Sequence, residues 1–453
     1  MSKKLALVAL DVISLYVALI LTLAVRYGAQ YKEQLNIHIL PFTIVFMLWI
    51  LVFYITNLYE ISAVKNSILF YSDLARAIIL ASGLAITAFY LLPILLITPK
   101  TNLFIFIVII SILLLAFRSA LNSLAGNSGK NKTLIVGFNE LSLELARELE
   151  ANPQLGYEVK YIIDINPTTQ RTEESFEKFG IIQGVENINK IIREEKINTV
   201  IVSQEAYKSN EIIDIFYKSI ENKVNFTNLS SFFEKITSRI PLGAISQAWF
   251  LDNLSEGSKK GFEFLKRLID IVFAIFIGIF VLAISPLIML VIKIDSSGPI
   301  FYRQKRLGQS GKIFEIIKFR TMAQDAEKDG AVWAQENDPR ITSIGKFLRK
   351  SRIDELPQIW NIIKGEMSFV GPRAERPEFH DKLKQGISYY EERYLVKPGL
   401  TGWAQINFRY GASVQDSAYK LQYDLYYIKN RSLFLDLGII LKTINITLRH
   451  AGR

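Results

Sequence analysis

The stretch IVFAIFIGIFVLAISPLIMLVI occupies residues 271–292 and is flanked by the basic residues Lys266 and Lys293. A helix of about 20 apolar residues is long enough to cross a bilayer. The run contains Ser285-Pro286, and a proline inside a helix removes one backbone hydrogen bond and bends the helix. The sequence therefore predicts either a kinked span or a helix that enters the membrane, turns and leaves on the same face. The residue pattern alone does not separate the two.

Four further apolar runs of similar length lie near the N-terminus, at Leu5–Val25, Leu40–Leu58, Leu74–Ile97 and Leu103–Leu121. We predict that residues 1–125 form a membrane α-helical bundle with four spans. The basic residues around these runs favour placing both ends of the bundle in the cytoplasm. Asp11 lies inside the first run, so we expect it to reach the interface or a partner on another helix.

From about Lys132 the sequence alternates short β-rich runs, such as TLIVG and TVIVS, with amphipathic helical stretches. This alternation predicts a central doubly wound, Rossmann-like α/β module over residues 130–230. Its first turn, residues 137–142, keeps only Gly137 of the dinucleotide fingerprint G-x-G-x-x-G. We therefore interpret the module as structural or regulatory. Residues 231–258 follow as a predicted linker.

The composition supports a membrane protein with a basic C-terminal part. The chain has 453 residues, 50% of them hydrophobic, a mean hydropathy of +0.23 and a net charge of +10. Residues 257–453 hold 31 Lys and Arg against 20 Asp and Glu. A basic surface suits lipid headgroups, phosphorylated substrates or nucleic acid. The absence of cysteine excludes thiol catalysis, disulfides and cysteine-based zinc sites.

Four strings in this basic part combine arginine, acidic residues, glycine and proline: KFRTM (318–322), RKSRIDELPQ (349–358), GPRAERPE (371–378) and KPGLTGW (397–403). A donor diphosphate needs cations around its oxygens and a nucleophile in line with phosphorus. The forked guanidinium groups suited to phosphate oxygens belong to Arg320, Arg349, Arg352, Arg373 and Arg376, and Lys318 adds an ammonium. Asp354 and Glu355 are adjacent, so one of them is able to attack phosphorus while the other helps to hold Mg²⁺.

In this order, the four strings resemble the bacterial sugar transferase family, the monotopic polyprenyl-phosphate phosphoglycosyl transferases. The resemblance covers about Phe262 to the C-terminus. Four spans and an α/β module before the catalytic part are similar to the large members that initiate exopolysaccharide, capsule or O-antigen units. The resemblance implies a mainly α catalytic domain over 259–453. This domain is expected to contain a re-entrant membrane helix at about 264–294, with its break at Ser285 and Pro286.

The resemblance also implies roles for individual residues. Asp354 is the expected nucleophile that forms an aspartyl-phosphosugar and releases UMP, and Glu355 is expected to support Mg²⁺ or Mn²⁺ beside it. Arg349 is expected to bind the polyprenyl phosphate, and Asp424 matches a supporting acid. The implied partners are a UDP-sugar, undecaprenyl phosphate and the lipid bilayer. The implied location is the bacterial inner membrane, with the catalytic domain facing the cytoplasm.

Two alternative functions are less consistent with the sequence. A membrane-bound nucleotide-sugar dehydratase or epimerase needs an intact dinucleotide loop and normally a Tyr-x-x-x-Lys pair, which this sequence lacks. A catalytically silent scaffold of the same family is disfavoured because Asp354, Glu355, Arg349 and Arg373 are all present. No nucleic-acid partner is expected, since the basic cluster at 303–312 carries no recognisable binding motif. A homo-oligomer and the identity of the sugar stay open.

Overall fold

The chain divides into two compact units, Met1–Leu229 and Ser230–Arg453, in a computed structural model. The structure describes residues 2–60, 66–92, 95, 97, 99–127, 130–165, 179–254, 259–323, 326, 338–408, 411 and 413–448. Each unit is described by itself below.

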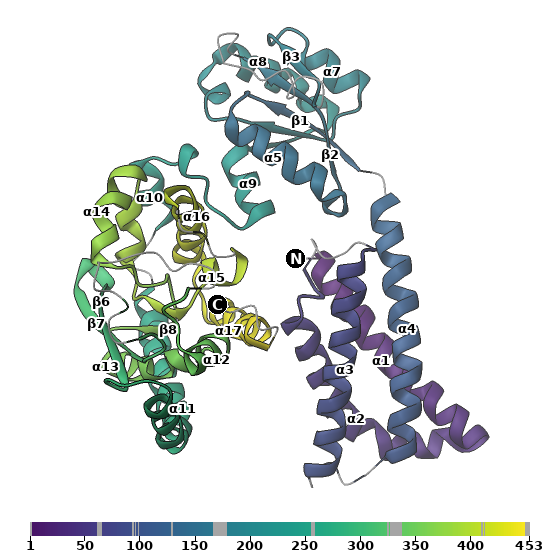
Figure 1. Ribbon diagram of the computed structural model, residues 1–453. Coiled ribbons are helices and arrows are strands. Elements are labelled where there is room, and N and C mark those ends of the chain that lie inside the picture. The colour runs from purple at the N-terminus through teal and green to yellow at the C-terminus, as the bar shows by residue number, and fades with distance from the viewer. Residues whose placement is uncertain are drawn as a thin grey trace. The chain divides into compact units, whose positions relative to one another are not determined.

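The first unit begins with the four predicted apolar helices, α1 (Ser2–Tyr27), α2 (Tyr31–Ile55), α3 (Ile68–Leu91) and α4 (Lys100–Asn127) (Figure 1). All four lie in segments long and apolar enough to cross a bilayer. The aromatic rings of Phe42, Trp49 and Phe106 are fully buried between them, and Phe42 and Trp49 each contact Phe106 edge to face. Apolar side chains such as Ile79 and Phe104 point outward, as expected for helices that face lipid.

A buried ion pair ties α1 to α4. The guanidinium Nη2 of Arg118 lies 2.5 Å from Oδ2 of Asp11, and its Nη1 donates to the carbonyl oxygen of Leu58 at 3.1 Å. The Arg118 and Asp11 side chains are only 2% and 4% exposed. The structure thus supplies the partner on another helix that was one of the two expectations for Asp11.

The central part of this unit is a five-stranded, wholly parallel sheet in the order β3-β2-β1-β4-β5. Its strands are β1 (Asn131–Val136), β2 (Tyr157–Asp164), β3 (Ile181–Gln183), β4 (Thr199–Val202) and β5 (Asn225–Asn228). Figure 1 shows α5 (Glu140–Ala151) against one side of the sheet and α7 (Ile188–Glu194) and α8 (Asn210–Ser219) against the other. Helices on both faces bury the strands, which explains their continuous apolar runs. The predicted parallel α/β module is confirmed.

The turn after β1 favours a structural role for this module. Gly137 has a φ of +108°, and a Cβ at this position would collide with the side chain of Ser203. Asn139 and Ser142 form a reciprocal capping box at the start of α5, with two hydrogen bonds of 2.9 Å. These groups already use backbone donors that a dinucleotide loop offers to pyrophosphate.

The second unit is mainly α and carries two small sheets, antiparallel β6-β7 and parallel β8-β9. Its strands are β6 (Phe301–Leu307), β7 (Ile313–Phe319), β8 (Ser368–Val370) and β9 (Gly399–Thr401). Its helices are α9 (Leu229–Thr237), α10 (Gln247–Asn253), α11 (Lys260–Asp295), α12 (Ser343–Lys350), α13 (Ile359–Lys364), α14 (Pro377–Gly386), α15 (Trp403–Asn407), α16 (Val414–Asn430) and α17 (Leu433–Leu448).

The stretch 231–258, predicted as a linker, contributes to the core of this second unit. Ile240 and Ile245 are buried in the same hydrophobic cluster as Leu425 of α16. The indole Nε1 of Trp403 donates to the carbonyl oxygen of Ser238 at 3.0 Å. Most of this stretch is therefore part of the folded unit, because its apolar side chains have a core to enter; residues 255–258 lie outside the described residues.

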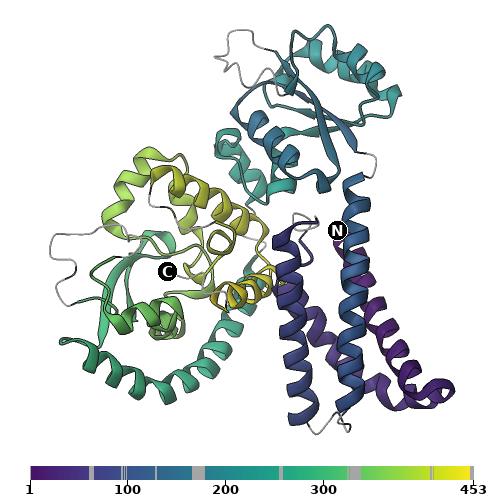
Figure 2. The ribbon, with the colours of Figure 1, turned by 45° about the vertical axis from the view of Figure 1, so that its right-hand side comes forward.

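Helix α11 contains the apolar run with Ser285-Pro286. It is one continuous helix of 36 residues, and Pro286 lies inside it. The hydroxyl of Ser285 donates to the carbonyl oxygen of Val281 at 2.6 Å, one turn back. Figure 2 shows the helix as an arc. The break expected at Ser285-Pro286 is therefore not found: the helix continues through both residues and is curved, because a proline removes one backbone hydrogen bond without necessarily ending a helix.

Candidate active site

The acidic pair lies on a short 3-10 helix, η10 (Ile353–Gln358), directly after α12. Between these helices Arg352 adopts φ +57°, a left-handed conformation that is uncommon for a residue with a side chain. Such strained positions persist where the surrounding structure holds them, and they gather at functional sites. The resulting turn places the side chains of Asp354 and Glu355 inside the unit, with only 7% and 8% of each residue exposed.

Three cations surround the carboxylate of Glu355. The ammonium of Lys318, from the end of β7, and Nη2 of Arg373 each donate to Oε1 at 2.9 Å. Nη1 of Arg352 lies 3.7 Å from Oε2. Burial by itself raises the pKa of Glu355, but the charges of Lys318, Arg373 and Arg352 outweigh it and lower this pKa below its usual range. Glu355 is therefore a fixed negative charge.

Asp354 differs from its neighbour because no described residue donates a hydrogen bond to its carboxylate. Burial raises the pKa of Asp354 to about 6, and the negative charge of Glu355 acts in the same direction against the cations Lys318, Arg349 and Arg373. At neutral pH the carboxylate is ionised, poorly solvated and not occupied by hydrogen-bond donors. Those are the properties of an available nucleophile.

Neither Arg349 nor Arg320 has a hydrogen bond to this pair among the described residues. Nε of Arg349 donates to the hydroxyl of Thr321 at 2.9 Å, and its charge is close enough to influence the pKa of Asp354. Nη2 of Arg320 instead donates to the carbonyl oxygen and hydroxyl of Ser296, at 2.6 and 2.9 Å, just beyond the end of α11. Arg320 thus connects the end of β7 to the end of α11.

Known proteins match this chain in two regions. A family model described as bacterial sugar transferase matches residues 262–450, and one described as a CoA-binding domain matches residues 54–227. A protein of Bacillus subtilis (strain 168), named for N-acetylgalactosaminyl 1-phosphate transfer to undecaprenyl phosphate, is 46% identical over 129 residues, 28% of this chain and 72% of that protein. The chain belongs to the bacterial sugar transferase family.

Two longer relatives align with this sugar transferase chain over less than half of their own lengths. The UDP-N-acetylgalactosamine-undecaprenyl-phosphate N-acetylgalactosaminephosphotransferase of Aeromonas hydrophila is 44% identical over 194 residues, 42% of this chain and 45% of the relative. The UDP-glucose:undecaprenyl-phosphate glucose-1-phosphate transferase of Escherichia coli (strain K12) is 39% identical over 182 residues, 40% of this chain and 39% of the relative. Their names specify different sugars.

Two of the other predicted site residues of this sugar transferase lie apart from the Asp354–Glu355 pair. Arg376 is 8% exposed, lies over the ring of Phe379 at 5.6 Å, and has Nε 3.6 Å from a carboxylate oxygen of Glu378. Asp424 is almost fully buried on α16, and burial raises its pKa to about 6 against the charge of Arg393. Neither residue is bonded to Asp354 or Glu355 in the part of the chain that the structure describes.

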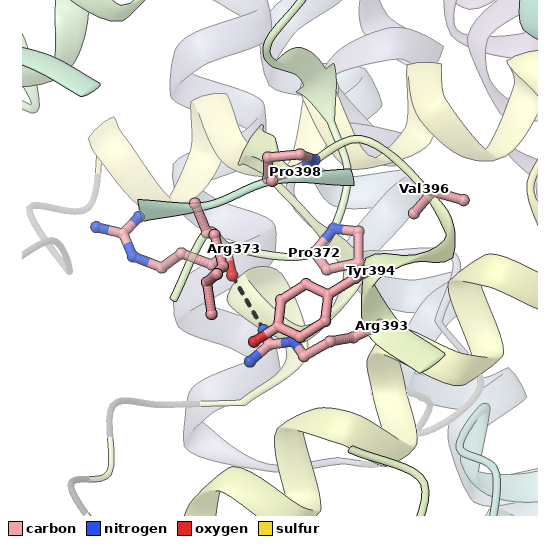
Figure 3. A pocket seen from close by; sticks show the side chains of 9 residues that line it. Pro372, Arg373, Arg393, Tyr394, Val396 and Pro398 are labelled. Atoms are coloured by element: carbon pink, nitrogen blue, oxygen red, sulfur yellow. Dashed lines mark hydrogen bonds between the residues drawn. The ribbon is translucent and has the colours of Figure 1, made fainter. Parts of the chain in front are cut away.

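Arg393 is a residue that the sequence interpretation missed. Its Nη2 donates to Oδ2 of Asp424 at 2.9 Å and to the carbonyl oxygen of Arg373 at 3.0 Å. Figure 3 shows this second bond and the side chains of Pro372 and Tyr394 around it. Arg393 therefore connects Asp424 to the backbone of Arg373, whose side chain donates to Glu355. It lies four residues before the string KPGLTGW, and that proximity is the one sequence signal for it.

Proposed function

We propose that this sugar transferase moves a hexose 1-phosphate from a UDP-sugar to undecaprenyl phosphate and so initiates an exopolysaccharide, capsule or O-antigen unit. The observation that carries the proposal is the contrast within the acidic pair. Asp354 is a buried carboxylate without a hydrogen-bond donor among the described residues, while the neighbouring Glu355 is held by Lys318 and Arg373. The names of the relatives support the same donor and acceptor classes.

The reaction has two half-reactions. An oxygen of Asp354 attacks the phosphorus that bears the sugar, the bond from that phosphorus to the bridging oxygen breaks, and UMP leaves. An oxygen of the acceptor phosphate then attacks the same phosphorus, the bond to Asp354 breaks, and the carboxylate is regenerated. Asp354 must be ionised for the first step, which the pKa near 6 permits at neutral pH.

The cations act on the phosphate oxygens. Negative charge on the donor and the leaving UMP needs fixed positive groups, because preorganised charge stabilises a transition state without rearrangement. Arg373 is suited to this task since its side chain is 46% exposed although one nitrogen contacts Glu355. Arg349 is the proposed ligand of the acceptor phosphate, next to Asp354 and held through Thr321.

The donor set fits Mg²⁺ or Mn²⁺ bound together with substrate. Among the described residues no three His, Asp or Glu side chains gather into a metal site. Mg²⁺ commonly takes one or two carboxylates and completes its shell with waters and substrate phosphates. Asp354 and Glu355 are the two carboxylates that would hold the ion, which when bound neutralises charge on the diphosphate.

We further propose that α11 re-enters the inner membrane and leaves on the cytoplasmic face, where nucleotide sugars are found. Three features support this: the curvature of the helix, Pro286 inside it, and the basic residues Lys266 and Lys293 near its two ends. Outward-facing apolar side chains along the helix, such as Leu282 and Leu287, would contact lipid. Exit on the opposite face would separate Asp354 from a cytoplasmic donor.

The decisive experiment incubates the purified full chain with undecaprenyl phosphate and a panel of UDP-sugars and measures UMP release. The panel includes UDP-glucose, UDP-galactose and their N-acetylated forms, because the relatives differ in the sugar that they are named for. We expect one sugar to be strongly preferred and Asp354→Asn to release no UMP. Absence of UMP from every donor, or full activity of Asp354→Asn, would overturn the proposal.

A further inference from the structure

A second polar pocket lies at the N-terminal turns of α11, within the C-terminal unit. Its lining comes from α11, β8, the segment before β9, and the end of α16: Glu263, Lys266, Arg267, Asp270, Ser368, Val370, Val396, Lys397, Tyr427 and Arg431. None of these residues belongs to the acidic pair or its cations. The pocket is therefore separate from the proposed site of phosphoryl transfer.

Most charges in this pocket are already paired. The ammonium of Lys266 lies 2.5 Å from Oδ2 of Asp436, and the hydroxyl of Tyr427 donates to the other oxygen of that carboxylate at 2.9 Å. Nε of Arg431 donates to Glu263 at 2.9 Å. Together these bonds form a rigid frame that joins α11 to α16 and α17.

Asp270 is also engaged from a neighbouring element, since its Oδ1 accepts a hydrogen bond from the backbone N–H of Phe369 at 3.2 Å. The two carboxylates that line the pocket, Glu263 and Asp270, thus each already accept a hydrogen bond.

Lys397 is the exception. Its ammonium has no hydrogen bond or ion pair with any described residue, although the side chain is half-buried. Arg267 is close to it: a Cβ added to Gly365 would lie 3.2 Å from Nη2 of Arg267 and 3.6 Å from Nζ of Lys397. Arg267 donates to the carbonyl oxygens of Ile362 and Ile363, at 2.6 and 2.7 Å, so neutral acceptors hold its charge in place.

Lys397 and Arg267 are neighbouring cations, and neither forms an ion pair with a carboxylate of the described residues, so together they form a site for an anion. Burial lowers the pKa of Lys397 and the positive charge of Arg267 acts in the same direction, while the carboxylates of Asp270 and Glu263 act against them; a bound anion would offset the repulsion between the two cations. The same turns of α11 expose Phe264 and Leu268, at 74% and 50%. Apolar exposure beside buried cations is typical of a segment at the depth of lipid headgroups.

We propose that this pocket binds the phosphate of an anionic phospholipid headgroup, with Lys397 and Arg267 as its ligands. Such a site would fix the depth of α11 in the bilayer independently of the sugar donor and the acceptor. Guanidinium and ammonium groups are the usual partners of phosphate oxygens.

The test measures thermal unfolding of the purified full chain in a neutral detergent, titrated with short-chain phosphatidylglycerol. Parallel titrations use short-chain phosphatidylcholine, inorganic phosphate and undecaprenyl phosphate. We expect phosphatidylglycerol to raise the unfolding temperature at lower concentration than the other three. Lys397→Met should weaken this response by about ten-fold, the usual scale for loss of one charge-assisted contact.

Two variants make the comparison specific. Lys397→Arg keeps the charge and should retain the response, and Lys235→Met, on an exposed residue of α9, should behave like the wild type. Should Lys397→Met be unstable, Lys397→Gln supplies the same comparison. An equal response of Lys397→Met and the wild type would overturn the proposal. So would a response to undecaprenyl phosphate alone, or an equal response to inorganic phosphate.

Discussion

Asp354 and Glu355 are adjacent and almost equally buried, yet their pKa values move in opposite directions. Burial raises the pKa of Asp354 to about 6, whereas the cations on Glu355 outweigh burial and lower its pKa. The difference arises from geometry, since Lys318 and Arg373 both donate to Glu355 and neither donates to Asp354. One carboxylate is thereby fixed and the other is left available.

The first prediction concerns the pH dependence of UMP release. Because the ionised form of Asp354 attacks phosphorus and its pKa is about 6, the initial rate should rise between pH 5 and pH 7 with a midpoint near 6. Initial rates at saturating donor, measured across this range, check the midpoint. A rate that is flat from pH 5 to pH 7 would contradict the assignment.

The same carboxyl group predicts a pH-dependent stability. Its folded pKa lies above the ordinary value of 3.8, so it stabilises the protein at low pH and loses that contribution as pH rises through 6. At pH 7 the free energy of unfolding of Asp354→Asn should therefore exceed that of the wild type by up to about 3 kcal/mol, and the variant should unfold at a higher temperature. Near pH 4 the two proteins should unfold alike. A less stable Asp354→Asn at pH 7 would disprove this prediction.

The second residue to change is Lys318. Its positive charge lowers the pKa of Asp354, so Lys318→Met should move the midpoint of the pH–rate profile above 6. Loss of one preorganised cation should also lower the maximal rate by about 100-fold. Lys318→Arg keeps the charge and should keep the midpoint close to that of the wild type. An unchanged midpoint in Lys318→Met would show that this charge does not act on Asp354.

The existence of the membrane helices could be predicted from sequence because each needs a long apolar run, but their ends could not. The third run was expected at Leu74–Ile97, whereas α3 spans Ile68–Leu91. Its start is set by the side chain of Ser67, which accepts a hydrogen bond from the backbone N–H of Phe70. Such a cap depends on a few local atoms and leaves no trace in hydropathy.

The candidate site shows a similar division. The adjacent acids could be located in the string RKSRIDELPQ, but the choice of partners depends on tertiary structure. Lys318 reaches Glu355, while Arg320, two residues later, turns to Ser296 at the end of α11. Arg393 lies outside all four strings and gains its role from contacts with Asp424 and Arg373. Spacing along the chain does not show which of these side chains contact one another.

Another prediction tests the path of α11. Lys266 is unsuited to labelling because it is paired with Asp436, so exposed positions at the two ends are preferable. In this cysteine-free chain, Lys260→Cys and Ser297→Cys should both resist an impermeant thiol reagent in intact cells. Both should react after the membrane is permeabilised. Labelling of Ser297→Cys alone in intact cells would show that α11 crosses the membrane.

A further prediction concerns the ion pair inside the four-helix bundle. Arg118→Leu leaves the carboxylate of Asp11 buried without its partner, which typically costs about 3 to 5 kcal/mol. We expect a large loss of thermal stability in detergent. The double variant Asp11→Leu with Arg118→Leu should recover most of it, because no unpaired charge remains. Arg76→Leu, whose pair with Asp73 is exposed, is the control and should change little. A double variant as unstable as Arg118→Leu would refute this account.

The last prediction is that the C-terminal unit works alone if its first two helices are kept. Every proposed phosphate contact lies after residue 257, yet residues before it pack into the same core. Ile240 and Ile245 are buried there, and Glu234 of α9 accepts a hydrogen bond from Lys429 at 2.8 Å. Burial of each isoleucine contributes about 1.5 to 3 kcal/mol.

A fragment of residues 230–453 should therefore fold in membranes and release UMP, because it retains the whole core. A fragment of residues 258–453 should unfold at a clearly lower temperature and lose activity with its fold. Thermal unfolding and UMP release, measured on both fragments in the same detergent, separate the two effects. If the 230–453 fragment is folded and inserted but inactive, the α/β module or the four-helix bundle takes part in the chemistry. If both fragments are equally stable, residues 230–257 do not stabilise the core of the C-terminal unit.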